Sequence, residues 1–186
     1  MNNDGLRVRF GPLVSAGVVM GAGLGGFVDG IVLHQIMQWH NMLSARTPPD
    51  TLVNAKINMA WDGFFHAGVW IVTAIGLAML FKGGARRDVP WSGKTFFGSL
   101  LTGWALFNLV EGIIDHHILR IHHVYEYASA GTQAMFDYGF LLIGGVLMGL
   151  VGMALVKSGK NSWRPGDALG AGVTADEATD RSAYLR

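Results

Sequence analysis

The chain has 186 residues, of which 51% are hydrophobic and only 15% are charged. Soluble globular domains carry about 25% charged residues, so this composition indicates a membrane protein. The absence of cysteine excludes disulfides, iron–sulfur clusters, thiolate-bound copper and thioether-attached haem. The net charge is +1 and no basic patch is interleaved with aromatic residues, which excludes a nucleic-acid partner.

Four apolar segments are long enough to cross a hydrocarbon core of about 30 Å, which takes roughly 20 helical residues. They cover residues 12–39, 59–81, 94–119 and 135–156. The predicted fold class is therefore all-α: an integral membrane four-helix bundle within a transmembrane domain of residues 1–157. Residues 158–186 have no apolar stripe, and we expect them to form a mobile cytoplasmic tail.

Basic residues gather at the connections on one side of the predicted bundle. That side has Arg7, Arg9, Lys82, Arg86, Arg87, Lys94, Lys157, Lys160 and Arg164, whereas the other connections have only Arg46, Lys56 and Arg120. Because lysine and arginine are enriched in cytoplasmic loops, this bias places both termini in the cytoplasm. We expect a multi-pass protein of the bacterial inner (plasma) membrane whose other side faces the periplasm or exterior.

The first and third predicted spans repeat one another. Residues 27–34 read FVDGIVLH and residues 109–116 read LVEGIIDH, and with the same shift His40 falls on His122. Residues 61–64 align more weakly with residues 136–139. The bundle is thus predicted to consist of two repeated helical hairpins, residues 12–82 and 94–157, related by an axis along the membrane normal.

All seven histidines and several acids fall on one side of the predicted bilayer. Ionisable side chains within a span cost about 2.5–3.5 kcal/mol each, so they normally face the bundle interior and mark a functional site. Imidazoles and carboxylates together suit copper, iron, zinc or manganese. The candidate metal ligands are Asp29, His34, His40, Asp62, His66, Glu111, His116, His117, His122 and His123. Glu111 and Asp115 are the candidate catalytic residues, as proton donors.

In a continuous helix, Asp29 and His40 lie about 16 Å apart, too far for one metal ion. We therefore expect two layers. The inner layer comprises Asp29, His34, Asp62, His66, Glu111, Asp115 and His116, and the outer layer comprises His40, His117, His122 and His123. At least one of Asp29, Asp62 and Asp137 is expected to orient a histidine by accepting a hydrogen bond.

These strings resemble a family of uncharacterised bacterial membrane proteins that are predicted to have four spans. The resemblance covers roughly residues 11–156 and depends on DGIVLHQ (29–35), QWH (38–40), DGFFH (62–66) and NLVEGIIDHH (108–117) with His122 and His123. Family members often have a histidine where this chain has Asn41. The family is associated with copper-handling assembly proteins of cytochrome oxidase. The resemblance therefore implies respiratory copper or oxygen chemistry, with an oxidase or copper-assembly protein as partner.

The leading functional hypothesis is a membrane metalloprotein with copper, or secondly iron, near the periplasmic face; zinc also fits the ligand types. Its role is redox chemistry on oxygen, superoxide or a small substrate, as a membrane-bound metal-dependent oxidoreductase, or metal handling for oxidase assembly. One alternative is a haem b electron carrier with His34 and His116, or His66 and one of them, as axial ligands. Another is a metal or proton transporter. The partners expected are the lipid bilayer and, in a homo-oligomer, further copies of the chain.

Overall fold

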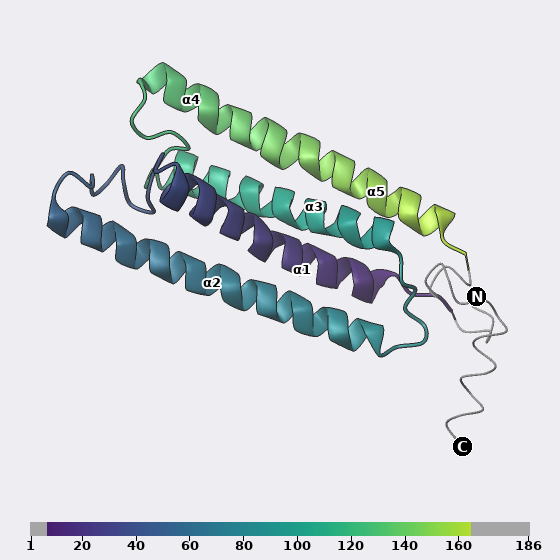
Figure 1. Ribbon diagram of the computed structural model, residues 1–186. Helices are drawn as coiled ribbons and strands as arrows, with labels where there is room; N and C mark the ends of the chain where they lie inside the picture. The colour runs from purple at the N-terminus through teal and green to yellow at the C-terminus, as the bar shows by residue number, and fades with distance from the viewer. Residues whose placement is uncertain (1–6, 165–186) are drawn as a thin grey trace.

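The structure, a computed structural model, describes residues 7–164 and is all-helical over that part of the chain (Figure 1). The helices form four long rods, and three of the rods contain a π-helical segment, labelled η. The rods are α1 (Gly11–Val28) with η1 (Asp29–Ile36); α2 (Leu52–Gly84); α3 (Gly93–Glu111) with η2 (Gly112–Ile118); and α4 (Ala130–Gly139) with η3 (Phe140–Leu147) and α5 (Met148–Ser162). Each rod is long and apolar enough to cross a membrane, which confirms the predicted all-α, four-span fold.

Polar caps make the second and fourth rods longer than their apolar stretches. The Thr51 side chain accepts a hydrogen bond from the Asn54 amide, and α2 begins at Leu52. Likewise Ser129 caps α4 by accepting from the Thr132 amide. Such N-caps satisfy amides that the first helical turn leaves free. Both helices therefore begin before the hydrophobic spans, and Asp62 and Asp137 lie inside the rods.

The parallel helices α1 and α3 form a central pair. α2 packs on α1, and η3 and α5 pack on α3 (Figure 1). A Cβ atom added to Gly21 would lie 2.0 Å from the Leu100 carbonyl oxygen, and one added to Gly103 would lie 1.9 Å from the Val18 carbonyl oxygen. Glycine thus lets the two backbones touch, as in other membrane helix pairs. Gly21 and Gly103, like Val18 and Leu100, are equivalent positions of the repeat, so the contact is reciprocal.

The outer rods follow the same repeat. Gly76 of α2 packs against Met20, and Gly152 of α5 packs against the equivalent residue Thr102. In sequence, Gly76 and Gly152 are one residue further apart than Asp62 and Asp137. The fourth rod therefore has one extra residue between Asp137 and Gly152. The π-helical segment η3 lies in this interval, and a π-helical turn accommodates one extra residue.

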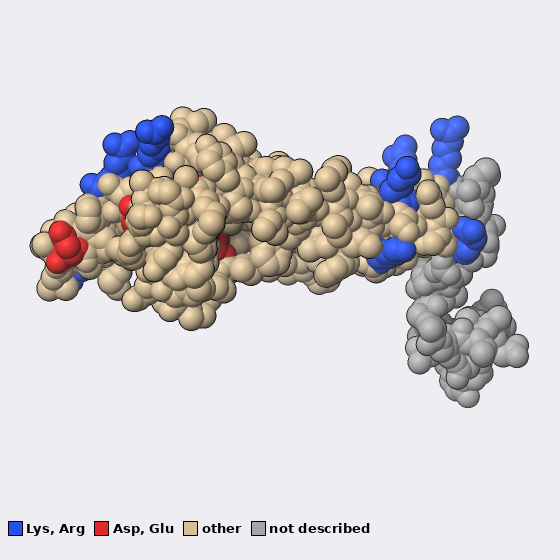
Figure 2. All heavy atoms as spheres, turned by 90° about the horizontal axis from the view of Figure 1, so that it is seen from above, with Lys and Arg blue, Asp and Glu red and all other residues tan. Residues whose placement is uncertain are grey.

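The two ends of the rods differ in charge. Figure 2 shows basic side chains crowded at the end where residues 7 and 164 lie, and fewer of them at the opposite end. We call the opposite end, which has the connections between η1 and α2 and between η2 and α4, the histidine end. Of the predicted mobile tail, residues 158–162 belong to α5, and residues 165–186 lie outside the described residues.

The backbone contact between α1 and α3 predicts a position-specific effect of adding one methyl group. Gly103→Ala should destabilise the protein by about 1–3 kcal/mol, because its Cβ has no space beside the Val18 carbonyl. The control is Gly68→Ala on the exposed face of α2, where a Cβ meets nothing within 4 Å. That variant should be neutral or slightly stabilised. Unfolding in mixed detergent micelles, followed by circular dichroism, measures both; equal midpoints would contradict the packing.

Candidate metal centre

Both central rods stop abruptly at the histidine end and reverse direction. The last π-helical bonds run from the Met37 amide to the Val32 carbonyl (2.8 Å) and from the Leu119 amide to the Ile114 carbonyl (2.7 Å). One residue later, Gln38 and Arg120 each have a φ of 50°. These are equivalent positions of the repeat, and a left-handed conformation is uncommon for residues other than glycine. The chain therefore folds back over the end of the helix that it has just left.

This reversal overturns the predicted two-layer arrangement. His40 and Asp29 offer ligand atoms that, together with one from Glu111, all lie within 4.8 Å of one another. The separation of about 16 Å that we expected holds only for a continuous helix. His40 and His122 therefore join the inner residues in one layer.

Six side chains form this layer, which we call the central cluster: Asp29, His34, His40, Glu111, His116 and His122. Each is buried, with at most 6% of its surface exposed. They form three overlapping groups with ligand atoms within 4.8 Å, namely His34, His40 and His122; Glu111, His116 and His122; and Asp29, His40 and Glu111. The repeat contributes three residues from each half, paired as Asp29 with Glu111, His34 with His116, and His40 with His122.

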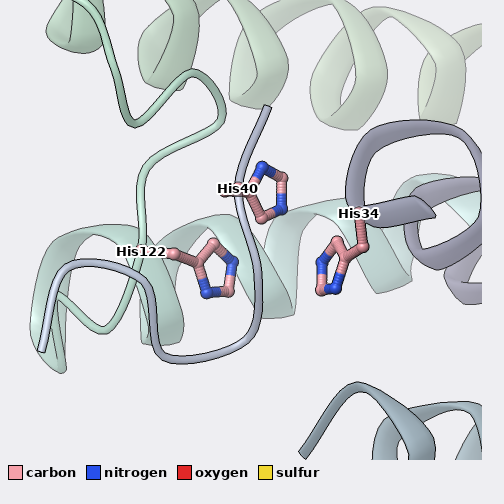
Figure 3. A group of neighbouring side chains, drawn as sticks. All are labelled: His34, His40 and His122. Atoms are coloured by element: carbon pink, nitrogen blue, oxygen red, sulfur yellow. The ribbon is translucent and has the colours of Figure 1, made fainter. Parts of the chain in front are cut away.

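The imidazole rings pack directly on one another. His40 and His122 are stacked, with ring centroids 4.5 Å apart and an angle of 4° between their planes. His34 lies edge-on to His40 at 4.5 Å, and His116 lies edge-on to His122 at 4.8 Å. Figure 3 shows His34, His40 and His122 turned toward a common centre from separate segments of the chain.

Hydrogen bonds on the outer side of the cluster fix the tautomers of two histidines. His40 Nδ1 donates to the Val124 carbonyl at 2.9 Å, and His122 Nδ1 donates to the Met42 carbonyl at 3.1 Å. The two bonds correspond to each other in the repeat, because each histidine donates to the backbone carbonyl of a residue in the other half. Burial lowers the pKa of His40 to about 4 and the pKa of His122 well below its usual value. Both rings are therefore neutral at neutral pH, and each Nε2 is a bare acceptor in the cluster.

Two acids outside the cluster lie beside its other histidines, and one of them accepts a hydrogen bond from its histidine. His34 Nδ1 donates to Asp62 Oδ1 at 2.9 Å, which confirms that one of the three expected acids orients a histidine. The Met42 amide donates to the same carboxylate at 2.8 Å. In the other half, the Val124 amide donates to Asp137 Oδ1 at 2.9 Å, and His116 Nδ1 lies 3.6 Å from that oxygen.

Asn41 and His123 occupy equivalent places beside these acids. Asn41 Nδ2 donates to Asp62 at 2.8 Å, and His123 Nδ1 donates to Asp137 at 2.6 Å. A histidine at position 41 would therefore lie beside an orienting carboxylate, as His123 does in the other half. No sequence motif marks Asn41 or the carbonyls of Met42 and Val124, and only the alignment of His40 with His122 points to this region.

The inward-facing atoms of the cluster have no hydrogen-bond partner. They are both oxygens of Asp29, Oε2 of Glu111, and Nε2 of His34, His40, His116 and His122. Histidines do lie near the acids: His34 Nε2 is 3.1 Å from Asp29 Oδ2, and His122 Nε2 is 3.5 Å from Glu111 Oε1. Two ionised carboxylates within 4.8 Å repel by about 3 kcal/mol or more at an effective dielectric constant of about 20. A cation at the centre, or a proton held by one of the two carboxylates, would remove this repulsion.

The remaining predicted site residues lie outside the three groups. His66 Nδ1 donates to the Asp62 backbone carbonyl at 2.7 Å. His117 stacks on Tyr138 with ring centroids 5.1 Å apart. Asp62 and His123 belong to the orienting network described above, and Asp115 is half-buried on η2.

The fold and the cluster together define a multi-pass membrane protein with a buried histidine and carboxylate site at one end of its bundle. The chain belongs to the family described as "Predicted membrane protein (DUF2243)", whose sequence model matches residues 16–159. No curated protein and no solved structure matches the chain.

The lowered pKa of His40 predicts how the metal-free protein responds to acid. A histidine with a pKa of about 4 when folded and about 6.5 when unfolded binds its proton more readily in the unfolded state. Stability should therefore fall as the pH drops from about 6.5 toward 4, by up to about 1.4 kcal/mol per pH unit for this group. Detergent unfolding between pH 7.5 and 4.5 measures the slope, which should be smaller in His40→Gln. An identical slope in both proteins would contradict the assignment.

Proposed function

We propose that the central cluster holds one or two transition-metal ions and that the protein is a membrane metalloprotein. The observation that carries this proposal is the gathering of buried polar atoms that satisfy no ordinary hydrogen bond: three carboxylate oxygens of Asp29 and Glu111 and four imidazole Nε2 atoms. The outer hydrogen bonds of His34, His40 and His122 are those that metal-binding histidines make through their other ring nitrogen. A cation at the centre would offset the carboxylate repulsion and satisfy the bare acceptors.

Copper is our first choice of metal and iron the second. The cluster offers more imidazole nitrogens than carboxylates and no thiolate, and among divalent first-row metals copper binds such donors most tightly. Zinc would also accept these ligands. His40, His122 and Glu111 each belong to two of the three groups, so they are the residues suited to lie between a pair of ions.

The depth of the cluster favours a resident metal and redox chemistry over metal delivery. A delivery protein must release its ion to a partner, whereas every residue of the cluster is buried. We propose a membrane-bound oxidoreductase in which Glu111 and Asp115 move protons. Asp115 is half-buried next to His116 in the chain and occupies the place that Leu33 holds in the first half, so this acid has no counterpart there. Metal handling for a respiratory oxidase is the weaker alternative.

The packing of the rings argues against a haem b protein. A haem with His34 and His116 as axial ligands needs its macrocycle between the two rings. The rings of His40 and His122 occupy that space, since each packs between His34 and His116 with centroid distances of 4.5 to 6.3 Å.

A transporter requires polar groups that continue across the bundle. Within the described residues, the buried ionisable side chains all lie at the histidine end. Toward the basic end the buried polar side chains are Thr95 and Ser99, whose hydroxyls bond within their own helix region, to Ser92 and to the Thr95 carbonyl. A path for ions across the membrane therefore has no support.

The charge difference between the two ends supports an orientation. Because basic residues crowd the end opposite the cluster, we propose that this end is cytoplasmic and that the cluster lies near the periplasmic face of a bacterial inner membrane (Figure 2).

Elemental analysis of detergent-purified protein tests the proposal. Wild-type protein from cells supplied with copper, iron and zinc should contain at least about one copper or iron ion per chain, and an absorption spectrum of the same sample should show no Soret band. His122→Ala should lose most of this metal, because His122 belongs to two of the three groups.

His117→Ala is the matched control, since His117 lies outside the three groups and stacks on Tyr138. It should retain the wild-type metal content. The proposal fails if wild-type protein contains no stoichiometric metal, or if both variants retain it equally.

A further inference from the structure

An apolar pocket lies against the central cluster, between the first rod and the third and fourth rods. Its volume is about 270 Å³, and its lining includes Gly25, Val28, Asp29, Trp104, Phe140 and Gly144. Asp29 is the residue of the cluster that reaches this pocket; its Oδ2 lies 3.1 Å from His34 Nε2, and its Oδ1 has no hydrogen-bond partner. The pocket therefore ends at the site itself.

The pocket exists because the repeat is broken at two positions. In the other half, the places of Gly25 and Gly144 are taken by Phe107 and Val69. These two side chains fill the equivalent space: a Cβ added to Gly26 would lie 2.4 Å from Val69 Cγ1 and 3.1 Å from Phe107 Cε2. The Phe107 ring also packs on Phe65, with centroids 6.0 Å apart. The cluster is thus flanked by a filled space on one side and an open pocket on the other.

The rim of the pocket faces the hydrocarbon of the membrane. Val28, which lines the pocket and is 39% exposed on the outside of the bundle, lies within the first membrane-crossing rod. A second apolar pocket of about 450 Å³ shares Leu33 and Phe140 with the first and continues toward the histidine end. A molecule that dissolves in the bilayer therefore meets an apolar path to Asp29.

The lining selects the chemical class of that molecule. Besides Asp29, the one polar side chain is Asn108, and its amide already donates to the Gly144 carbonyl at 2.9 Å. An ion or a strongly polar molecule would lose its hydration here without replacement, which costs several kcal/mol. An apolar cavity of about 150 Å³ holds benzene or xenon, so a pocket of about 270 Å³ has room for dioxygen and for a molecule at least as large as a single ring.

We propose that a small uncharged molecule dissolved in the bilayer reaches the metal centre sideways through this pocket. This inference rests on the proposed function and narrows its substrate class, since it removes superoxide and other ions from the candidates. Leu33 and Phe140 line both pockets, and Val28 lies at the membrane side of the inner one.

The test blocks the pocket and compares the result with a matched substitution. Val28→Phe places a ring at the rim, whereas Val110→Phe places the same ring at the repeat-equivalent position, which is 49% exposed and lies on the filled side. Two probes are used on wild type and both variants. Xenon in pressurised crystals reports occupancy of the pocket without any metal, and nitric oxide binding to the reduced, metal-loaded protein in stopped flow reports access to the centre.

We expect xenon density beside Trp104 in wild type and Val110→Phe and none in Val28→Phe. Nitric oxide should bind at least about tenfold more slowly to Val28→Phe than to the other two proteins, at equal metal content. Absence of xenon from wild type, or equal nitric oxide rates in all three proteins, would overturn the inference. Xenon in the pocket of a protein that binds no metal would overturn the proposed function and, with it, the role of the pocket as a path to a metal.

Discussion

Burial of two carboxylates and four imidazoles at one point inside a membrane bundle is the constraint on which the rest of the structure depends. Each ionisable group costs free energy in hydrocarbon, and two carboxylates within 4.8 Å repel one another. Several segments of the chain hold these groups together. Two helices stop at left-handed residues, two loops fold back, and Asp62 and Asp137 each fix a loop amide and a histidine. Such a network has a physical reason if a cation occupies its centre.

The internal repeat explains how one chain surrounds a single centre. Each half bonds its loop histidine to a backbone carbonyl of the other half. His40 bonds to the carbonyl of Val124, and His122 bonds to that of Met42. Neither half therefore completes the cluster alone. The two halves also differ beside the cluster. Gly25 replaces Phe107 and opens a pocket, while Asp115 replaces Leu33 and adds an acid beside the cluster.

Hydropathy was sufficient to predict the four spans, and the aligned acid-glycine strings indicated the repeat, because both are local properties of the sequence. Six of the predicted ligands, the central cluster, come together as buried neighbours. Their arrangement in one layer could not be predicted from the sequence, because glutamine and arginine, the residues at positions 38 and 120, rarely adopt the left-handed conformation that reverses the chain there. The same holds for the loop carbonyls that fix His40 and His122, because any residue supplies a carbonyl. The pocket depends on packing between rods and follows from no motif.

The most direct measurement is the X-ray absorption spectrum of the metal-loaded protein at the edge of the bound metal. The account predicts a first shell of nitrogen and oxygen at about 2.0 Å with the outer scattering of at least two imidazoles, and a weaker imidazole signal in His40→Ala. A first shell of oxygen alone, or an imidazole signal that His40→Ala leaves unchanged, would contradict the claim that the central cluster binds the metal.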